Sequence, residues 1–223
     1  MLLLTQPQQR RKNKSLRLKN HPKRWFFSFF LIFLIKKMKK KSINIGDLIV
    51  ADANILNDLQ FNRTVILLTK YNSTGCLGFI LNRKLNIKLK EIIPDTDSNI
   101  KIYYGGPVEP ENLYFIHNVP SLIPNSIEIS DGLYWAGEFS NIIELINQKK
   151  INQNNIRFFL GYTGWDQEQL ICEIDEKTWL IKENIYKNNL LKKVPSNLWK
   201  ELMMTFGNNE IIWCNAPEDP VLN

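Results

Sequence analysis

The chain of 223 residues is long enough for one globular domain, and its formal net charge of +7 and pI of about 9.2 resemble those of nucleic-acid-binding proteins. The charge is unevenly distributed, because residues 1–37 contain ten Lys or Arg and no acid, whereas residues 38–223 contain 19 basic and 22 acidic residues. The body therefore has a net charge of −3, which removes the usual electrostatic argument for direct binding of a phosphate backbone.

The N-terminal part of the chain differs in composition from the rest. Residues 25–35 form an apolar run of 11 residues, too short for a membrane-spanning helix, and a lysine-rich segment follows at residues 36–41. Three interpretations stay open: an upstream extension outside the native protein with translation starting at Met38, an anchor at a membrane surface, or an atypical export signal. We divide the chain into a basic and apolar leader, residues 1–44, and a single domain, residues 45–223.

Short apolar runs separated by turn residues predict a domain rich in strands, with few helices. This pattern is typical of the α+β class with a mainly antiparallel sheet. The expected strands are residues 45–51, 63–69, 76–81, 100–104, 113–117, 126–129, 133–136, 158–160, 178–181 and 211–213. The expected helices are residues 85–93, 140–149 with Ser140 as cap, a short helix after Asp166, and 197–206 with Ser196 as cap.

The stretch at residues 158–181 is the centre of the predicted fold. Asp166 is a good N-cap, and Gln169 three residues later completes the pattern of a capping box. Trp165 before the cap and Leu170 in the first turn are spaced as a hydrophobic staple. The sequence therefore predicts a strand, a tight loop, a stapled helix and a returning strand in this region.

The cysteines and the histidine of the domain give no sign of catalysis or metal binding. Cys76, Cys172 and Cys214 are widely separated in apolar contexts, which predicts buried, reduced thiols and a cytoplasmic protein. His117 is the only histidine after the leader and lacks clustered metal ligands, so we expect a partly buried histidine at the end of a strand. The G-x-S-x-G nucleophile motif is absent. We expect no catalytic residue, no metal site and no cofactor.

Two pairs of glycines mark tight places in the backbone. Gly161 and Gly164 are expected to end a strand with a loop before a helix, and Gly105 and Gly106 follow another strand. Such loops can bind anions, but neither phosphate-binding motif occurs, and Asp166 opposes an anion at the second pair. The favoured interpretation is tight turns with close approach of two backbones.

Arg63, Asn82 and Arg83 are the polar residues of greatest interest, because each lies at the end of an apolar strand. One interpretation is an internal salt bridge of an arginine, for example to Asp58 or Glu109. The other is a shallow cleft, completed by Gly105, Gly106 and Trp165, that accepts an acidic ligand or the carboxylate of a partner.

Several segments together resemble the YqgE/AlgH family of small bacterial proteins. The matching segments are GDLIVADANILNDLQFNRTVILL (46–68), GFILNRKL (78–85), YYGGPV (103–108), DGLYWAGEF (131–139), FFLGYTGWDQEQLICEI (158–174) and DPVLN (219–223). The resemblance implies a single α+β domain whose mainly antiparallel split sheet curls into a partly closed pseudo-barrel with a few flanking helices. Members of the family are labelled as transcriptional regulators, and no biochemical activity defines them.

We expect a non-catalytic regulatory or interaction protein that acts through protein contacts in the cytoplasm. The alternative is a protein that binds a small acidic ligand, or an enzyme, with its site in the Arg63, Arg83 and Gly105 region. A third class, direct DNA binding, would need a basic face that the acidic body does not indicate. Contact with a membrane is expected only through the leader. The identity of the partner is not predicted.

Overall fold

The structure is a computed structural model, and it describes residues 42–55, 58–193, 195–207 and 214. The predicted leader lies outside the described residues except for its last three, and so does the strand predicted at residues 211–213. The division at residue 45 stays a prediction. None of the described helices is long and apolar enough to cross a membrane.

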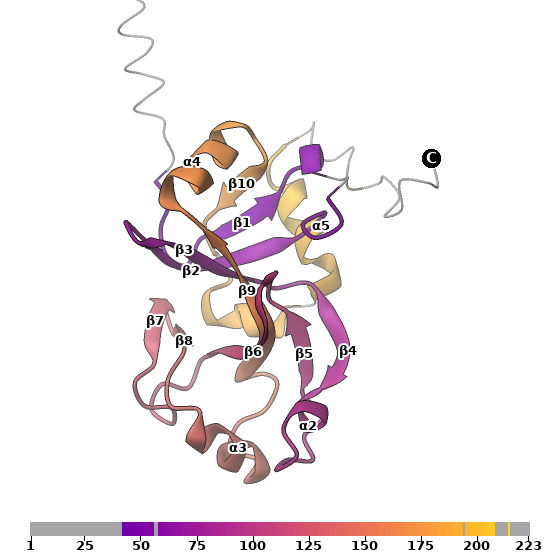
Figure 1. Cartoon of the computed structure of the whole chain (residues 1–223), viewed down its shortest axis with the longest axis vertical. Coiled ribbons are helices and arrows are strands. Elements are labelled where there is room, and N and C mark those ends of the chain that lie inside the picture. The colour runs from indigo at the N-terminus through magenta and orange to yellow at the C-terminus, as the bar shows by residue number, and fades with distance from the viewer. Residues whose placement is uncertain (1–41, 56–57, 194, 208–213, 215–223) are drawn as a thin grey trace, which may run out of the picture. The chain divides into compact units, whose positions relative to one another are not determined.

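The described part of the chain has an α+β fold, as predicted, with ten strands and a few short helices (Figure 1). The strands are β1 (Leu48–Ala51), β2 (Val65–Asn72), β3 (Gly75–Ile80), β4 (Lys84–Lys88), β5 (Lys101–Tyr104), β6 (Val108–His117), β7 (Ile127–Ser130), β8 (Leu133–Trp135), β9 (Ile156–Trp165) and β10 (Trp179–Lys182). The helices are η1 (Ala53–Ile55), α2 (Leu89–Ile92), α3 (Ser140–Asn147), α4 (Gln167–Asp175), η2 (Lys187–Lys192) and α5 (Pro195–Met204).

Strand β9 holds the sheet together. One edge of β9 pairs antiparallel with β6, and the other edge pairs parallel with β5 near its start and antiparallel with β3 near its end. Beyond β3 the sheet continues through β2 and β1 to β10, and beyond β6 it continues through β8 to β7. The sheet divides at β9, because one edge of this strand pairs with both β5 and β3. Among the described strands β10 pairs only with β1 and β7 pairs only with β8, so the sheet is not closed into a barrel. The α+β fold with a mainly antiparallel split sheet is therefore confirmed, in a form that is not closed into a barrel.

The two faces of β9 serve two hydrophobic clusters. Successive side chains of a strand point to opposite faces, and accordingly Phe159 belongs to one cluster and Phe158 to the other. The cluster that contains Phe159 is built from β1, β2 and β3 with α4 and α5. The cluster that contains Phe158 includes residues of β5, α2 and α3. In Figure 1, α4 and α5 accordingly lie at one end of the domain and α2 and α3 at the other.

The glycines of β9 do not end the strand, contrary to the prediction. Strand β9 continues through Gly161 and Gly164 to Trp165. Gly161 has a φ of 68° and lies against Gly105, whose N–H donates to the Leu160 carbonyl over 2.7 Å. A Cβ atom on Gly105 would lie 2.1 Å from the carbonyl oxygen of Gly161, so two backbones meet where side chains do not fit. The predicted close approach of backbones is confirmed, but inside a continuous sheet.

The segment predicted as a helix at residues 85–93 is a strand followed by one helical turn. Residues Lys84–Lys88 form β4, and only Leu89–Ile92 are helical. Leu85 and Ile87 alternate with polar residues, which is the period of a strand, and β4 pairs with β5. The alternation of apolar and polar residues thus indicated the strand correctly.

Helix α4 begins where predicted but is not capped as predicted. Asp166 occupies the N-cap position in an extended conformation, yet its side chain makes no capping hydrogen bond. Gln169 does not close a capping box, because its Nε2 donates to Oε1 of Glu173 over 2.9 Å. Trp165 and Leu170 are both buried in the same hydrophobic cluster, as a staple requires.

The prediction that Ser140 and Ser196 cap their helices is also wrong. Helix α3 begins at Ser140 itself, with Phe139 at the N-cap position and no side-chain cap. Helix α5 begins at Pro195, which places Ser196 inside the first turn. Proline is favoured at that first position because the missing N–H needs no partner there.

Candidate functional site

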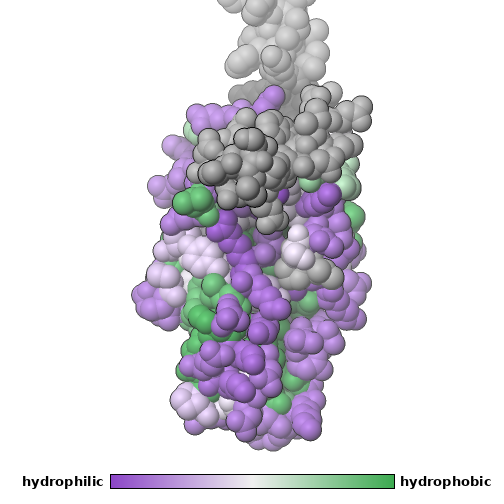
Figure 2. All heavy atoms as spheres, turned by 90° about the vertical axis from the view of Figure 1, so that its right-hand side faces the viewer, coloured by the Kyte–Doolittle hydropathy of each residue, from purple (hydrophilic) through white to green (hydrophobic). Residues whose placement is uncertain are grey.

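The candidate site is a polar pocket of about 560 Å³, which we call the arginine pocket. It lies where the start of β2, the end of β3 and helix α5 come together. The described residues that line it are Asn62, Arg63, Asn82, Arg83, Ser196, Asn197, Trp199, Lys200 and Cys214. Three of these side chains are cationic, and none of the described lining residues is acidic. Figure 2 shows the side of the domain on which α5 and β4 lie in Figure 1, and hydrophilic residues dominate the part of it that is described.

Arg63 is held against helix α5. Its guanidinium carbon lies 5.2 Å from the centroid of the Trp199 ring, within the range of a cation–π interaction. Trp199 is only 4% exposed, and its Nε1 donates to the carbonyl of Ala51 over 2.8 Å. The surface on which Arg63 rests is therefore fixed by a contact between α5 and β1.

Asn82 ties the end of β3 to the start of β2. Its Oδ1 accepts the N–H of Val65 over 2.9 Å, and its Nδ2 donates to the carbonyl of Arg63 over 2.8 Å. The side-chain amide therefore takes the place of the next pair of backbone hydrogen bonds between β2 and β3. This geometry gives Asn82 a structural part, and through the Arg63 backbone it positions one wall of the pocket.

Arg83 makes hydrogen bonds to backbone carbonyls. Its Nη1 donates to the carbonyl of Leu59 over 2.8 Å and its Nη2 to that of Asn62 over 3.2 Å. Burial lowers the pKa of Arg83, while the nearby Tyr104 and Asp58 oppose that shift. Within the described residues no carboxylate forms an ion pair with Arg83, so for Arg83 the structure does not have the expected salt bridge to Asp58 or Glu109.

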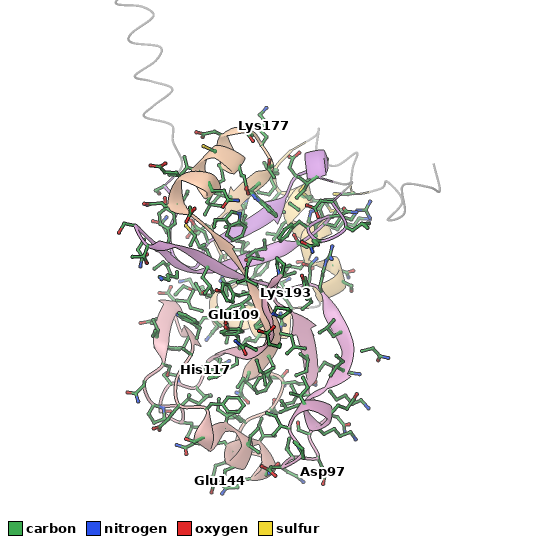
Figure 3. All side chains as sticks on the ribbon, viewed as in Figure 1. Asp97, Glu109, His117, Glu144, Lys177 and Lys193 are labelled. Atoms are coloured by element: carbon green, nitrogen blue, oxygen red, sulfur yellow. The ribbon has the colours of Figure 1, made fainter. Side chains whose placement is uncertain are left out.

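Both carboxylates suggested as partners are engaged elsewhere. Oδ1 of Asp58 accepts the backbone N–H groups of Gln60 and Phe61 over 2.7 and 3.1 Å. Glu109 (labelled in Figure 3) accepts the hydroxyl of Tyr114 and the amide of Asn112. These contacts lower the pKa of Glu109, and burial together with the Glu109 contact raises the pKa of Tyr114 to about 12.

Only three of the six predicted site residues come together. Gly105 and Gly106 are buried in the backbone crossing with β9, and Trp165 lines a different hollow of about 410 Å³. Trp165 pairs with Cys76 at the start of β3, whereas Arg83 follows the end of β3, so the two residues lie at opposite ends of one strand. A part in binding for any of the six residues stays a prediction.

His117 is more deeply buried than predicted. It is the last residue of β6 (Figure 3) and 0% exposed, and its Nδ1 accepts the N–H of Val119 over 3.3 Å. Burial lowers the pKa of His117 to about 4, although the Ala136 backbone acts in the opposite direction. The imidazole is therefore neutral at pH 7. Within the described residues no group of three or more His, Cys, Asp and Glu is placed to hold a metal ion.

The cysteines differ from the prediction at one position. Cys76 and Cys214 are buried, and burial raises the pKa of each thiol. Cys172 lies on α4 and is exposed, because it falls on the opposite side of the helix from buried Leu170. The expectation of three buried thiols is therefore wrong for Cys172.

One buried charge was missed at the level of the sequence. Arg157 is the second residue of β9 and is 5% exposed. The signal was a single charge inside an otherwise apolar run, Ile156 to Leu160, whose residues are almost all buried.

Comparison with known proteins identifies the family. Residues 48–210 match the family described as AlgH-like. A UPF0301 protein of Chlorobium limicola is 37% identical over 179 residues, which are 80% of this chain and 95% of the relative. A UPF0301 protein of Bacteroides thetaiotaomicron is 36% identical over 182 residues, 80% of this chain and 90% of the relative. The chain therefore belongs to the AlgH-like family, as its sequence segments indicated.

Solved structures support the same fold. The solution structure of the AlgH protein from Pseudomonas aeruginosa matches with a TM-score of 0.60 at 21% identity, over 80% of this chain and 98% of that chain. A crystal structure of a protein from Corynebacterium diphtheriae matches with a TM-score of 0.62 at 18% identity, over 82% of this chain and 97% of that chain. At these identities the likeness concerns the fold.

Proposed function

We propose that this protein is a non-catalytic interaction protein that binds an acidic segment of a partner protein in the arginine pocket. The observation that carries the proposal is that Arg63, Arg83 and Lys200 line one pocket in which no described lining residue is acidic. Carboxylates are the protein groups that guanidinium and ammonium groups recognise most directly. The pocket is therefore complementary to Asp or Glu side chains or to a C-terminal carboxylate.

A peptide fits the polar lining better than a bare anion does. Oδ1 of Asn62 is buried in the pocket wall and has no hydrogen-bond partner within the described residues. A buried acceptor without a donor is unfavourable, and the N–H of a peptide backbone would satisfy it once the Asn62 side chain turns its amide toward the pocket. An acidic segment carries both groups, the carboxylate for the cations and the N–H for Asn62.

The regulatory part of the proposal follows from the family resemblance. Regulation of transcription would then come through protein contacts, because the body outside the leader is mildly acidic. We place the protein in the cytoplasm, in keeping with the two buried thiols of Cys76 and Cys214. No residue is assigned a catalytic part.

A small acidic ligand is the second candidate. The volume of about 560 Å³ lies within the range of small-molecule sites, about 300–1,000 Å³, and such a ligand would use the same cations. This candidate differs from the first in that recognition would not need a peptide backbone.

The experiment is an NMR titration of the ¹⁵N-labelled full chain with an acetylated, amidated peptide rich in Asp and Glu. The control peptide has Asn and Gln in their place, and a second arm uses citrate and glutarate. Binding in the arginine pocket should shift the amides of residues 62–63, 82–83 and 196–200 with the acidic peptide alone. Shifts with the small acids but not with the peptide would favour the second candidate, and shifts confined to other surfaces would contradict both.

A further inference from the structure

A second basic site surrounds the buried guanidinium of Arg157. Burial of an arginine is unfavourable unless its charge is balanced, and Arg157 is 5% exposed. Its Nη2 donates to the carbonyl of Leu191 over 2.9 Å, and its Nη1 donates to that of Leu81 over 3.4 Å. The guanidinium carbon lies 4.9 Å from the centroid of the Tyr103 ring.

These contacts hold Arg157 in place without neutralising it. Two carbonyls and an aromatic ring supply partial negative charge only, and within the described residues no carboxylate forms an ion pair with Arg157. A guanidinium has five N–H donors, of which these hydrogen bonds use two. Arg157 lines a hollow that is open to solvent, where its remaining N–H donors can meet a ligand.

The hollow has a volume of about 250 Å³ and is strongly basic, and we call it the Arg157 hollow. Its lysines come from separate elements: Lys84 begins β4, Lys101 begins β5, and Lys192 ends η2. In the part of the chain that the structure describes, none of these three ammonium groups forms an ion pair. Lys193 (labelled in Figure 3) also lines the hollow, but it pairs with Glu201 over 2.8 Å.

We propose that the Arg157 hollow binds a phosphate group, either free phosphate or the phosphate of a small ester. A buried guanidinium offers its planar donors to two oxygens of one anion, and three lysines around it balance a charge of about −2. Arg157 and these three lysines are four cationic groups, and none of the described lining residues is acidic. Their positive charge exceeds what the single negative charge of one carboxylate would balance. The volume is slightly below the roughly 300 Å³ at which sites for larger ligands begin, so the hollow fits an ion or a small ester.

This site is separate from the arginine pocket. The two share none of their described lining residues, and the phosphate proposal does not rest on binding of an acidic segment. Arg83 and Lys84 are neighbours in the chain, but each lines only one of the two sites. Variants that test one site can therefore leave the other unchanged.

The test is isothermal titration of the full chain with inorganic phosphate and with phenyl phosphate, at constant ionic strength set with chloride. The test variant combines Lys101→Gln with Lys192→Gln and keeps Arg157 and its hydrogen bonds. The control combines Lys149→Gln with Lys150→Gln, which removes the same charge from the exposed turn that follows α3. We expect one saturable site, an affinity about tenfold lower in the test variant, and less than a twofold change in the control.

The side chain of Arg157 supplies an independent readout. In ¹⁵N spectra its Nε–H resonance should shift on addition of either phosphate compound, with the same saturation as the heat signal. Tighter binding of phenyl phosphate would assign the site to an ester, and tighter binding of inorganic phosphate to the free ion; either result supports the proposal. Absence of saturation below about 10 mM, or equal affinities of the test variant and the control, would overturn it.

Discussion

The indole N–H groups of Trp165 and Trp179 donate to one and the same atom, Oε2 of Glu173, over 2.9 and 2.6 Å. The two rings meet edge to face with centroids 5.9 Å apart, and both are nearly fully buried. Trp165 ends β9, Trp179 begins β10, and Glu173 lies on α4 between them. A single carboxylate thus fixes the helix to both strands that flank it in the sequence.

Glu173→Ala should destabilise the protein, because it leaves two buried indole donors without an acceptor. The expected loss in free energy of unfolding is about 2–4 kcal/mol. Glu168→Ala is the matched control, since Glu168 lies exposed on the same helix, and it should change stability by less than about 0.5 kcal/mol. Urea unfolding followed by circular dichroism measures both. Equal stabilities of the two variants would show that the shared acceptor contributes nothing.

Gly161→Ala should be among the most damaging small substitutions in the chain. A Cβ atom there would lie 2.3 Å from the carbonyl oxygen of Gly106, and the φ of 68° is unfavourable for alanine. We expect a loss of about 3 kcal/mol or more, or a chain that does not fold. Gly164→Ala in the same strand is the control: its nearest contact is 3.4 Å, and about 1 kcal/mol or less should be lost. Thermal melts of the two variants compare them, and similar melting temperatures would disprove the crossing.

Stability should depend on pH through His117. Its pKa of about 4 in the folded protein lies below the ordinary value of 6.5, so the unfolded chain binds more protons between these values. The free energy of unfolding should therefore fall as the pH is lowered through this window, by about 3 kcal/mol in all. His117→Asn keeps an acceptor for the Val119 N–H but does not titrate, so its loss should be smaller. Unfolding measured at pH 7, 6, 5 and 4 tests this, and parallel curves would contradict a buried neutral imidazole.

Asn82→Ala should lower stability, because the N–H of Val65 and the carbonyl of Arg63 both lose their partner. The expected loss is about 2–3 kcal/mol. Asn197 lines the same pocket, and its exposed side chain makes no hydrogen bond within the described residues, so Asn197→Ala should cost less than about 0.5 kcal/mol. Urea unfolding separates the two. An unchanged free energy of unfolding in Asn82→Ala would show that the amide does not replace a hydrogen bond between β2 and β3.

Most of the fold could be predicted from the sequence, and the errors have local causes. Apolar runs and turn residues placed nearly all strands, since period and turn chemistry are local properties. The continuity of β9 through Gly161 was missed because glycine normally marks a turn. Only the approach of the Gly106 and Val108 carbonyls from another part of the chain makes a glycine necessary inside this strand. Closure into a barrel is likewise not decided by local pattern, because it depends on whether the edge strands β7 and β10 find a second partner.

The candidate site could be predicted in part, for a geometric reason. Strands β2 and β3 form an antiparallel hairpin, so Arg63 before β2 and Asn82 after β3 must lie side by side. Trp165 could not be placed from sequence, since its pairing with Cys76 at the far end of β3 is a long-range contact. Lys200 reaches the pocket only because α5 packs beside β1, which no sequence pattern revealed.

The affinity of an acidic peptide for Lys200→Glu tests the central claim most directly. Lys200 is exposed and forms no ion pair within the described residues, so charge reversal there should leave the melting temperature unchanged. Fluorescence polarisation of a labelled Asp- and Glu-rich peptide should show binding about tenfold or more weaker than to the wild type. Lys150→Glu, in the turn that follows α3, should bind as the wild type does. Equal affinities for Lys200→Glu and Lys150→Glu would contradict recognition of an acidic segment in the arginine pocket.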